Sequence, residues 1–388
     1  MPRVSIMLMA YNRAEMLKEA IEGYLCQTFE DFELIILDDC STDYTAEVVM
    51  SYRDPRLLYL RNSVNRGIIG NSGHVWWRGA GEFIKVANDD DIAHPTLLER
   101  EIEAMDAHPA AMVVCCNMRA MDEKGRITQR RMDTGLKDRV FKKGDYIQAY
   151  MEERFIAYWP GYLFRVNDAY WDIVNEPMDV GNLGDILALG RSNLYGEIVY
   201  LADPLIDYRI HGGQDTFNAD IIKFDIAYHE VTKQLCKAHG LKRLLPSIEA
   251  SQLRHQIVQE LDHGRTPDKL LKKLQGLPQC AYGLPAIPDG RAKALRGKHV
   301  CILGSFLNAY LLLKECEASG VKVGYFLDDN KNRQGQMLAG IPIVALDRLG
   351  NEKWDAVLLS NEQRPPEMIK QRLRQFTDTN LIHWRDLK

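Results

Sequence analysis

Three consecutive carboxylates, Asp89–Asp91, are the clearest chemical feature of this 388-residue chain. They directly follow an apolar, strand-like stretch at residues 82–87 and precede Pro95 and a helical pattern that begins near Thr96. Adjacent carboxylates repel one another, so placing them at the end of a buried strand costs free energy unless a cation binds there. The triplet therefore favours a divalent metal site. The alternative is a solvated turn that caps the next helix.

Two earlier apolar runs also end in polar residues. Residues 4–9 have the pattern of a strand buried on both faces and lead into Ala10–Arg13, and residues 32–37 lead into Asp38 and Asp39. A helical pattern follows each run. Strands that alternate with helices predict a mostly parallel sheet whose ligands bind at the carboxyl ends of the strands. We therefore expect these polar segments and the acidic triplet to meet at one edge of the sheet.

Several separate stretches of residues 4–215 together resemble family 2 glycosyltransferases of the GT-A type. The likeness is carried by residues 4–13 with their YN turn, LDDCSTD at 37–43, GEFI at 81–84, NDDD at 88–91 with Pro95 and Leu98–Glu99, Gly184–Asp185, and LIDYRIH at 205–211. Each motif is short, but their order and spacing together are specific. The resemblance implies an α/β fold with a doubly wound, mixed or parallel sheet, and transfer of a sugar from a nucleotide-sugar donor.

The resemblance also implies which residues bind the donor. It places Asp39 against the nucleobase and the following residues beside the donor: Ala10, Tyr11, Asn12, Arg13, Asn65 and Asp89. Asp39 has an alternative role as a helix cap, although Ser41 or Thr42 could cap that helix instead. Two departures from the family pattern leave the donor open, because Cys40 replaces a turn glycine and Asn71 stands where a base-contacting segment usually begins. The preference for UDP-sugars rests only on the resemblance to the family.

For the metal, the resemblance implies Mn²⁺ or Mg²⁺, with Asp90 as the first ligand. A metal would stabilise the negative charge that develops on the departing diphosphate. Asp89 would contact the ribose or share the metal, and Asp91 would be a second ligand or would orient its neighbours. His211 would complete the metal shell or contact the diphosphate, with a solvated loop histidine as the alternative. Asn88 departs from the family, since an amide supplies no charge to a metal.

Asp185 is the candidate general base that takes the proton of the acceptor hydroxyl, as the resemblance implies for inverting transfer. It stands at the start of a helical pattern, so an amino-terminal cap is its competing role. The segment that would bind the acceptor contains Tyr158, Trp159 and Gly161, because aromatic faces suit the C–H surface of a sugar. The alternative for these aromatic residues is a place in the core.

After His211 the pattern becomes helical, and residues 276–290 are rich in proline and glycine, which is typical of a linker. We therefore expect three parts: a GT-A domain at 1–215, a helical segment with a linker at 216–290, and a smaller α/β domain at 291–388.

The last domain resembles the Rossmann-like, nucleotide-binding half-domain of polysaccharide-modifying enzymes. Only Gly304 of a dinucleotide-binding glycine pattern is present, although Asp328 could meet a ribose hydroxyl. We therefore do not expect NAD or another nucleotide here. A packing, dimerisation or carrier-binding role is favoured, including assembly into a homo-oligomer through this domain.

Composition excludes several classes of partner. The formal net charge of −5 and the lack of a long basic run argue against a nucleic-acid partner. No apolar run approaches the length of a transmembrane segment, and the first residues lack a signal-peptide cleavage pattern. The eight cysteines show no metal or disulfide spacing. We expect a cytoplasmic protein, with peripheral association at the inner face of the membrane as a further option.

The sequence thus predicts an inverting, metal-dependent glycosyltransferase of bacterial surface or capsular polysaccharide synthesis. Its acceptor would be a saccharide hydroxyl, free or lipid-linked. One alternative is a nucleotidyltransferase on a similar sheet, but that enzyme would need a basic, glycine-rich loop where Ala10–Arg13 stands. The other alternative is a non-catalytic scaffold that binds nucleotide sugars.

Overall fold

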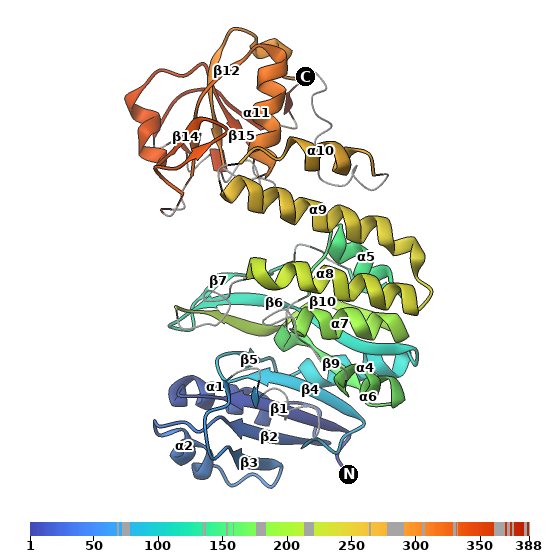
Figure 1. Ribbon diagram of the computed structural model, residues 1–388. Coiled ribbons are helices and arrows are strands. Elements are labelled where there is room, and N and C mark those ends of the chain that lie inside the picture. Colours follow the sequence, from blue (N-terminus) through green and yellow to red (C-terminus); the bar gives the residue numbers. More distant parts are fainter. Residues whose placement is uncertain are drawn as a thin grey trace. The chain divides into compact units, whose positions relative to one another are not determined.

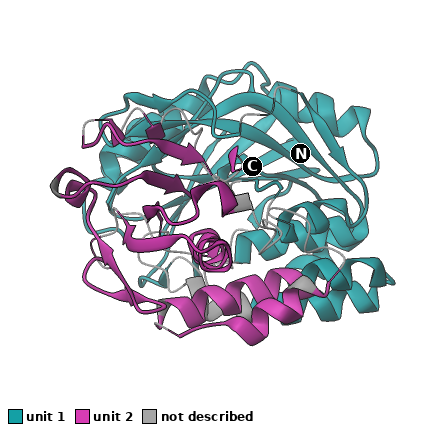
Figure 2. Ribbon diagram, turned by 90° about the horizontal axis from the view of Figure 1, so that it is seen from above, with its two compact units in different colours: residues 1–248 teal, residues 249–388 magenta. Residues whose placement is uncertain are grey.

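A computed structural model gives the fold of the chain (Figure 1). It describes all residues except 68–69, 72–77, 134, 136, 153, 158, 176–183, 213–220, 264, 278–290, 305–306, 329–330, 332, 361–368, 371–372, 375, 384–385 and 388. The chain divides into two compact units, residues 1–248 and 249–388, coloured separately in Figure 2. The finer boundaries at 215 and 290 stay predictions, and most of the predicted linker lies outside the described residues.

Unit 1 is built on a ten-stranded mixed sheet whose main path runs in the order β3-β2-β1-β4-β9-β6-β10-β5, with β7 paired to β6 and β8 to β10. The strands are β1 Val4–Ala10, β2 Phe32–Asp38, β3 Leu57–Arg61, β4 Phe83–Asn88, β5 Ile92–Ala93, β6 Ala111–Asp122, β7 Ile127–Gln129, β8 Arg139–Phe141, β9 Leu163–Arg165 and β10 Glu197–Ile210. Strands β3, β2, β1 and β4 are mutually parallel, and β9 runs antiparallel between β4 and β6. The α/β fold class predicted from the sequence is confirmed.

Helices cover both faces of this sheet. They are α1 Ala14–Leu25, α2 Thr45–Ser51, α4 Leu97–Ala107, α5 Asp145–Met151, α6 Asp168–Asn175, α7 Gly184–Tyr195 and α8 Ile221–Ala238, with short 3₁₀ turns at Trp159–Gly161 and Lys242–Leu244. Ile6 and Leu8 of β1 pack on the side of α1 and α4, whereas Met7 packs on the side of α5, α6 and α7. Because both faces are covered, residues 6–10 of β1 are all apolar.

Strand register brings the predicted site together. Ala10 is paired with Asp38, and Met9 is paired with Asn88, so β1, β2 and β4 end at the same level. The residues that follow each strand therefore start from one edge of the sheet. Cys115 and Cys116 of β6 are buried free thiols.

The predicted capping of α2 by Ser41 or Thr42 is wrong. The helix begins at Thr45, whose backbone N–H donates to Asp43 Oδ1 at 3.0 Å. The Ser41 and Thr42 groups are instead bonded to Asn12, which lies in the turn after β1. A contact distant in sequence thus replaces the local cap.

Unit 2 contains a six-stranded sheet of order β13-β14-β12-β11-β15-β16. Its elements are α10 Asp268–Gln275, β11 His299–Leu303, α11 Leu307–Ser319, β12 Lys322–Leu327, β13 Met337–Leu338, β14 Ile341–Val344, β15 Ala356–Leu359 and β16 Leu381–His383, with 3₁₀ turns at Arg291–Leu295 and Leu346–Asn351. Helix α9, Leu245–Asp262, spans the unit boundary. The pairs within β14, β12, β11, β15 and β16 are parallel, as in a Rossmann-like sheet.

Gly304 has a packing reason of its own. It adopts φ +99°, and a Cβ there would lie 2.6 Å from Ser360 Oγ, which donates to Leu303 O. A glycine at this position is therefore explained by the approach of Ser360 without any nucleotide. The next two residues of the turn lie outside the described part of the chain.

Candidate active site

The turn after β1 is tied to the turn after β2. The backbone N–H of Asp39 donates to Ala10 O at 2.9 Å, and that of Asn12 donates to Ser41 Oγ at 3.0 Å. Asn12 Oδ1 accepts from the backbone N–H of Thr42 at 2.7 Å. Asn12 adopts φ +51°, a left-handed conformation that asparagine tolerates better than most residues. The Asn12 side chain therefore holds two loops of the predicted donor pocket together.

Cys40 also adopts a left-handed conformation, with φ +64°. The sequence comparison had placed it where the family has a turn glycine, and this backbone geometry explains why glycine suits the position.

Asp39 is buried and anchors the segment after β3. Its Oδ1 accepts from Asn62 Nδ2 at 2.8 Å and from the backbone N–H of Arg66 at 2.9 Å. Asn62 Nδ2 also donates to Asn71 Oδ1 at 3.0 Å. These contacts exclude the helix-cap alternative for Asp39. Its contact with a nucleobase stays a prediction.

Asn71 and Asn65 act locally in this segment. Asn71 Nδ2 donates to Leu37 O at 3.1 Å and so closes over the end of β2. Asn65 is exposed, and its Oδ1 accepts from the backbone N–H of Gly67 at 2.7 Å. Sequence reasoning gave no role to Asn62 or Asn71, since only the folded chain brings Asn62 to Asp39 and Asn71 to Asn62.

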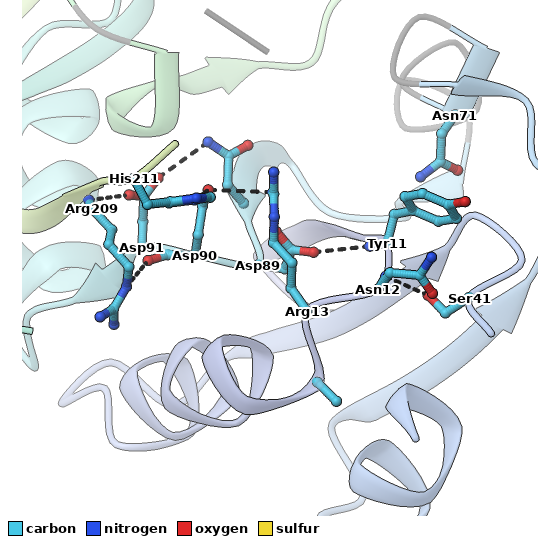
Figure 3. Close-up of polar contacts among 12 residues, drawn as sticks. Tyr11, Asn12, Arg13, Ser41, Asn71, Asp89, Asp90, Asp91, Arg209 and His211 are labelled. Carbon is cyan, nitrogen blue, oxygen red and sulfur yellow. Dashed lines mark hydrogen bonds and ion pairs between the residues drawn. The ribbon is translucent and has the colours of Figure 1, made fainter. Parts of the chain in front are cut away.

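Asp89 links the triplet to the turn after β1. Its Oδ2 accepts from the backbone N–H of Tyr11 at 2.9 Å, and its Oδ1 lies 2.9 Å from Arg13 Nη1 (Figure 3). Burial raises the pKa of Asp89 to about 6, against the opposing effect of the Arg13 charge. The ring of Tyr11 is exposed. Three predicted donor residues thus lie together at the end of β1.

Asp90 and His211, the two residues predicted to bind the metal, are in contact. Asp90 Oδ2 lies 3.0 Å from His211 Nε2 and 3.3 Å from Arg13 Nη1. Both side chains of the Asp90–His211 pair are 6% exposed, which is not the state of a solvated loop histidine. The solvated-turn alternative for the triplet fails for the same reason, since its three carboxylates are buried.

Asp91 makes contacts that favour the orienting role. Its Oδ1 accepts from the backbone N–H of Arg209 at 2.9 Å, and its Oδ2 accepts from Asn88 Nδ2 at 3.1 Å. Burial and the neighbouring Asp90 charge hold the pKa of Asp91 well above its ordinary value. The amide at position 88, which departs from the family, therefore serves as a donor to this carboxyl group.

Arg209 is a residue of the site that sequence reasoning quoted only as part of a motif. It is 1% exposed, and its Nε donates to Asp90 O at 2.9 Å. Its Nη1 donates to Glu123 O at 3.2 Å, and its Nη2 donates to Glu19 Oε2 at 2.9 Å. The signal available in the sequence was an arginine near the carboxyl end of an otherwise buried strand, where an unpaired charge is costly.

Asp185 lies in the first turn of α7 and is half-buried. Its Oδ1 accepts from the backbone N–H of Ile186 at 2.7 Å, and burial raises the pKa of Asp185 to about 6. The pKa of Tyr162 is raised by burial first and then by the charges of Tyr146 and Asp185.

The predicted acceptor segment is only partly described. Tyr158 and the side chain of Trp159 lie outside the described residues. Gly161 is buried against β6, where a Cβ would lie 2.9 Å from Met118 Cε and 3.2 Å from Cys116 O. Close packing thus requires a glycine here, and its contact with an acceptor stays a prediction.

The residues at the carboxyl edge of the sheet fit a metal ion whose other ligands come from the substrate and water. No group of three metal-binding side chains is found among the described residues, but Asp90 and His211 offer a carboxylate oxygen and an imidazole nitrogen. Mg²⁺ is commonly held by one or two protein ligands together with substrate phosphates and water. A hollow of about 560 Å³ lies beside His211, lined by Asp122, Glu123, Lys124, Arg126, Ile210, His211 and Gly212.

Comparison with known proteins gives a family match for part of the chain. Residues 5–168 match the family described as Glycosyl transferase family 2. The chain therefore carries a family 2 glycosyltransferase domain. Its fold is that of GT-A enzymes: the crystal structure of S. aureus TarS 1–349 in complex with UDP-GlcNAc is similar with a TM-score of 0.52, at 17% identity, over 82% of this chain and 89% of that chain.

Among its relatives, two proteins are similar to part of the chain. The EpsE protein of Bacillus subtilis is 31% identical over 127 residues, which are 32% of this chain and 46% of EpsE. The GalNAc(5)-diNAcBac-PP-undecaprenol beta-1,3-glucosyltransferase of Campylobacter jejuni is 28% identical over 161 residues, which are 40% of this chain and 51% of that enzyme. The matches thus cover about half the length of these relatives. Within the described residues, no helix has the length and apolarity that crossing a bilayer requires.

Proposed function

We propose that this protein is an inverting, metal-dependent glycosyltransferase that moves a sugar from a nucleotide-sugar donor to a saccharide hydroxyl. The observation that carries the proposal is the convergence of Asp89, Asp90 and His211 at the edge of the sheet that also holds Asp39. The family 2 glycosyltransferase domain supplies the reaction class. Transfer requires stabilisation of a departing diphosphate, and buried carboxylates suit a cation that would do this.

In this proposal Asp90 and His211 hold Mn²⁺ or Mg²⁺, and Asp89 and the turn after β1 hold the nucleotide. The bound metal would supply positive charge to the diphosphate oxygens as the bond from the anomeric carbon to the phosphate oxygen breaks. Arg209 fixes the backbone of Asp90 through its contact with Asp90 O, so the carboxylate is already positioned before the donor binds.

Asp185 takes the proton of the acceptor hydroxyl in the proposed reaction. The oxygen of that hydroxyl forms the new bond to the anomeric carbon on the side opposite the departing diphosphate, so a single displacement inverts the configuration. A carboxylate whose pKa lies near 6 is ionised at neutral pH and is a stronger base than an exposed aspartate.

The donor is proposed to be a UDP-sugar, and the acceptor a growing or lipid-linked saccharide of a surface polysaccharide. The first proposal has the support of the UDP-GlcNAc complex of TarS, and the second that of the lipid-linked acceptor in the name of the Campylobacter relative. A lipid-linked acceptor would bring the protein to the cytoplasmic face of the membrane.

A panel of UDP-, TDP-, GDP- and CMP-sugars with Mn²⁺ tests the proposal. We expect slow release of nucleotide from one donor class, and a thermal shift with the matching nucleoside diphosphate. Donor release that is undiminished in the metal-free enzyme and in Asp90→Asn would overturn the metal-dependent mechanism. A thermal shift without release from any donor would favour the non-catalytic scaffold. Incorporation of a nucleoside monophosphate from a triphosphate would favour a nucleotidyltransferase.

A further inference from the structure

Arg13 makes ion-pair contacts with two acidic side chains of the candidate metal site. Its Nη1 lies 2.9 Å from Asp89 Oδ1 and 3.3 Å from Asp90 Oδ2. In Figure 3 its guanidinium end is directed from the turn after β1 toward these carboxylates. The side chain of Arg13 is 27% exposed, whereas those of Asp89 and Asp90 are 4% and 6% exposed. The guanidinium-bearing side chain of Arg13 is therefore more accessible to solvent than either carboxylate.

The oxygen of Asp90 that Arg13 contacts is also the oxygen that faces His211. Asp90 Oδ2 lies 3.0 Å from His211 Nε2 and 3.3 Å from Arg13 Nη1. A metal bound by Asp90 and His211 would approach this same oxygen. Two cations beside one carboxylate oxygen repel each other, so the contact with Arg13 opposes entry of the metal.

We infer that Arg13 is a counter-ion that neutralises Asp89 and Asp90 until a metal and a nucleoside diphosphate arrive together. The inference rests on the proposed metal dependence. Asp90 and His211 provide only two ligands, so the metal needs phosphate oxygens to complete its shell. The same phosphates offer Arg13 a new anionic partner, since a guanidinium binds phosphate well. Metal and nucleotide therefore promote each other's binding, and the metal alone binds weakly.

The test measures Mn²⁺ affinity by calorimetry and by loss of the free Mn²⁺ electron paramagnetic resonance signal, with and without UDP. In the wild-type protein we expect UDP to increase Mn²⁺ affinity at least about tenfold, a coupling in the usual range for linked ligands. Arg13→Gln should bind Mn²⁺ alone at least about fivefold more tightly than wild type, because a positive charge has been removed. Its gain in affinity from UDP should be correspondingly smaller.

Two variants serve as controls. Arg13→Lys keeps the charge and should resemble wild type for Mn²⁺ alone. Arg100→Gln removes an arginine of α4 whose partners are Asp203 and Glu103, and it should leave both affinities unchanged.

Several outcomes overturn the inference. One is an Mn²⁺ affinity of Arg13→Gln that is equal to or weaker than that of wild type when UDP is absent. If this variant does not fold, the wild-type protein still decides, because equal Mn²⁺ affinity with and without UDP contradicts a nucleotide-dependent exchange. Asp90→Asn separates the two proposals. If it loses Mn²⁺ binding while Arg13→Gln gains none, only the role of Arg13 fails. If it binds Mn²⁺ as wild type does, the metal proposal fails as well.

Discussion

Asp90 and His211 lie 121 positions apart in the chain, yet Asp90 Oδ2 and His211 Nε2 are separated by only 3.0 Å. The first residue follows β4 and the second follows β10, and the intervening β5 pairs with β10. The contact therefore depends on the sheet and not on a local turn. It joins the acidic triplet to the last of the family motifs in one site.

Asp90→Asn should abolish most of the transfer activity. The amide keeps the shape of the side chain but loses the charge that a metal requires, and we expect turnover to fall on the order of 10²–10³-fold, as for loss of one strong electrostatic contact. The melting temperature should hold or rise, since one of three adjacent buried carboxylates is removed. Donor hydrolysis and circular dichroism measure the two effects.

His211→Gln should have a smaller effect on turnover, about 10- to 100-fold. It should also raise the Mn²⁺ concentration that gives half-maximal rate. Wild-type Mn²⁺ dependence in this variant would remove His211 from the metal shell while leaving Asp90 in place.

Asp185→Asn should lower kcat by about 10²–10⁴-fold, the usual contribution of a general base, with little change in donor KM. In the wild type, kcat/KM should rise with pH through about 6 and then level off, because the pKa of Asp185 is raised to about 6 and only its ionised form accepts a proton. The residual rate of the variant should lack this limb. A profile that retains the limb would assign the base role to another group.

Arg209→Lys tests whether the planar fork of the arginine positions Asp90. Lysine keeps the charge but cannot reach Asp90 O, Glu123 O and Glu19 together, so we expect Mn²⁺–UDP affinity to fall about tenfold and stability to fall by about 1–3 kcal/mol. Glu19→Gln is the matched control, because its carboxylate is 49% exposed and contacts only one end of the fork. Lost stability with unchanged ligand affinity would make Arg209 a purely structural residue.

The strands could be predicted well from the sequence because they are buried on both faces. The apolar runs at 4–9 and 32–37 end within one residue of β1 and β2, and the polar residues after them do meet at one edge. Acidic residues at strand ends also carry a strong signal, since burial of Asp89 or Asp90 without a cation is costly.

Contacts between distant segments could not be predicted. Nothing local indicates that Ser41 would bond to Asn12 instead of capping a helix, or that Asn62 would hold Asp39. These bonds form because β1, β2 and β3 are neighbours in register, and a short polar side chain then has several partners within reach.

The fully buried ion pair of Lys85 and Glu101 gives the last prediction. Lys85 of β4 and Glu101 of α4 are both 0% exposed, with Nζ 2.6 Å from Oε1. No hydrogen-bond partner for the second Glu101 oxygen lies within the part of the chain that the structure describes. Removing one partner leaves an uncompensated buried charge, so Lys85→Met should cost about 3–5 kcal/mol, whereas the double variant Lys85→Met, Glu101→Leu should recover most of that loss.

The pH dependence of stability checks the same pair. Burial raises the pKa of Glu101 from 4.5 to about 7, against the lowering effect of Lys85. The folded state thus holds the proton more tightly than the unfolded state. The contribution of the Glu101 proton to the free energy of unfolding is fully present below pH 4.5 and is lost as the pH rises to about 7. Urea unfolding at several pH values should show this decline in wild type, a steeper decline in Lys85→Met, and none from this site in the double variant.

Lys142→Met, which breaks the exposed pair with Glu197, should cost at most about 1 kcal/mol. An equally small loss in Lys85→Met would mean that Glu101 no longer carries a buried charge, because it takes up a proton or is reached by water.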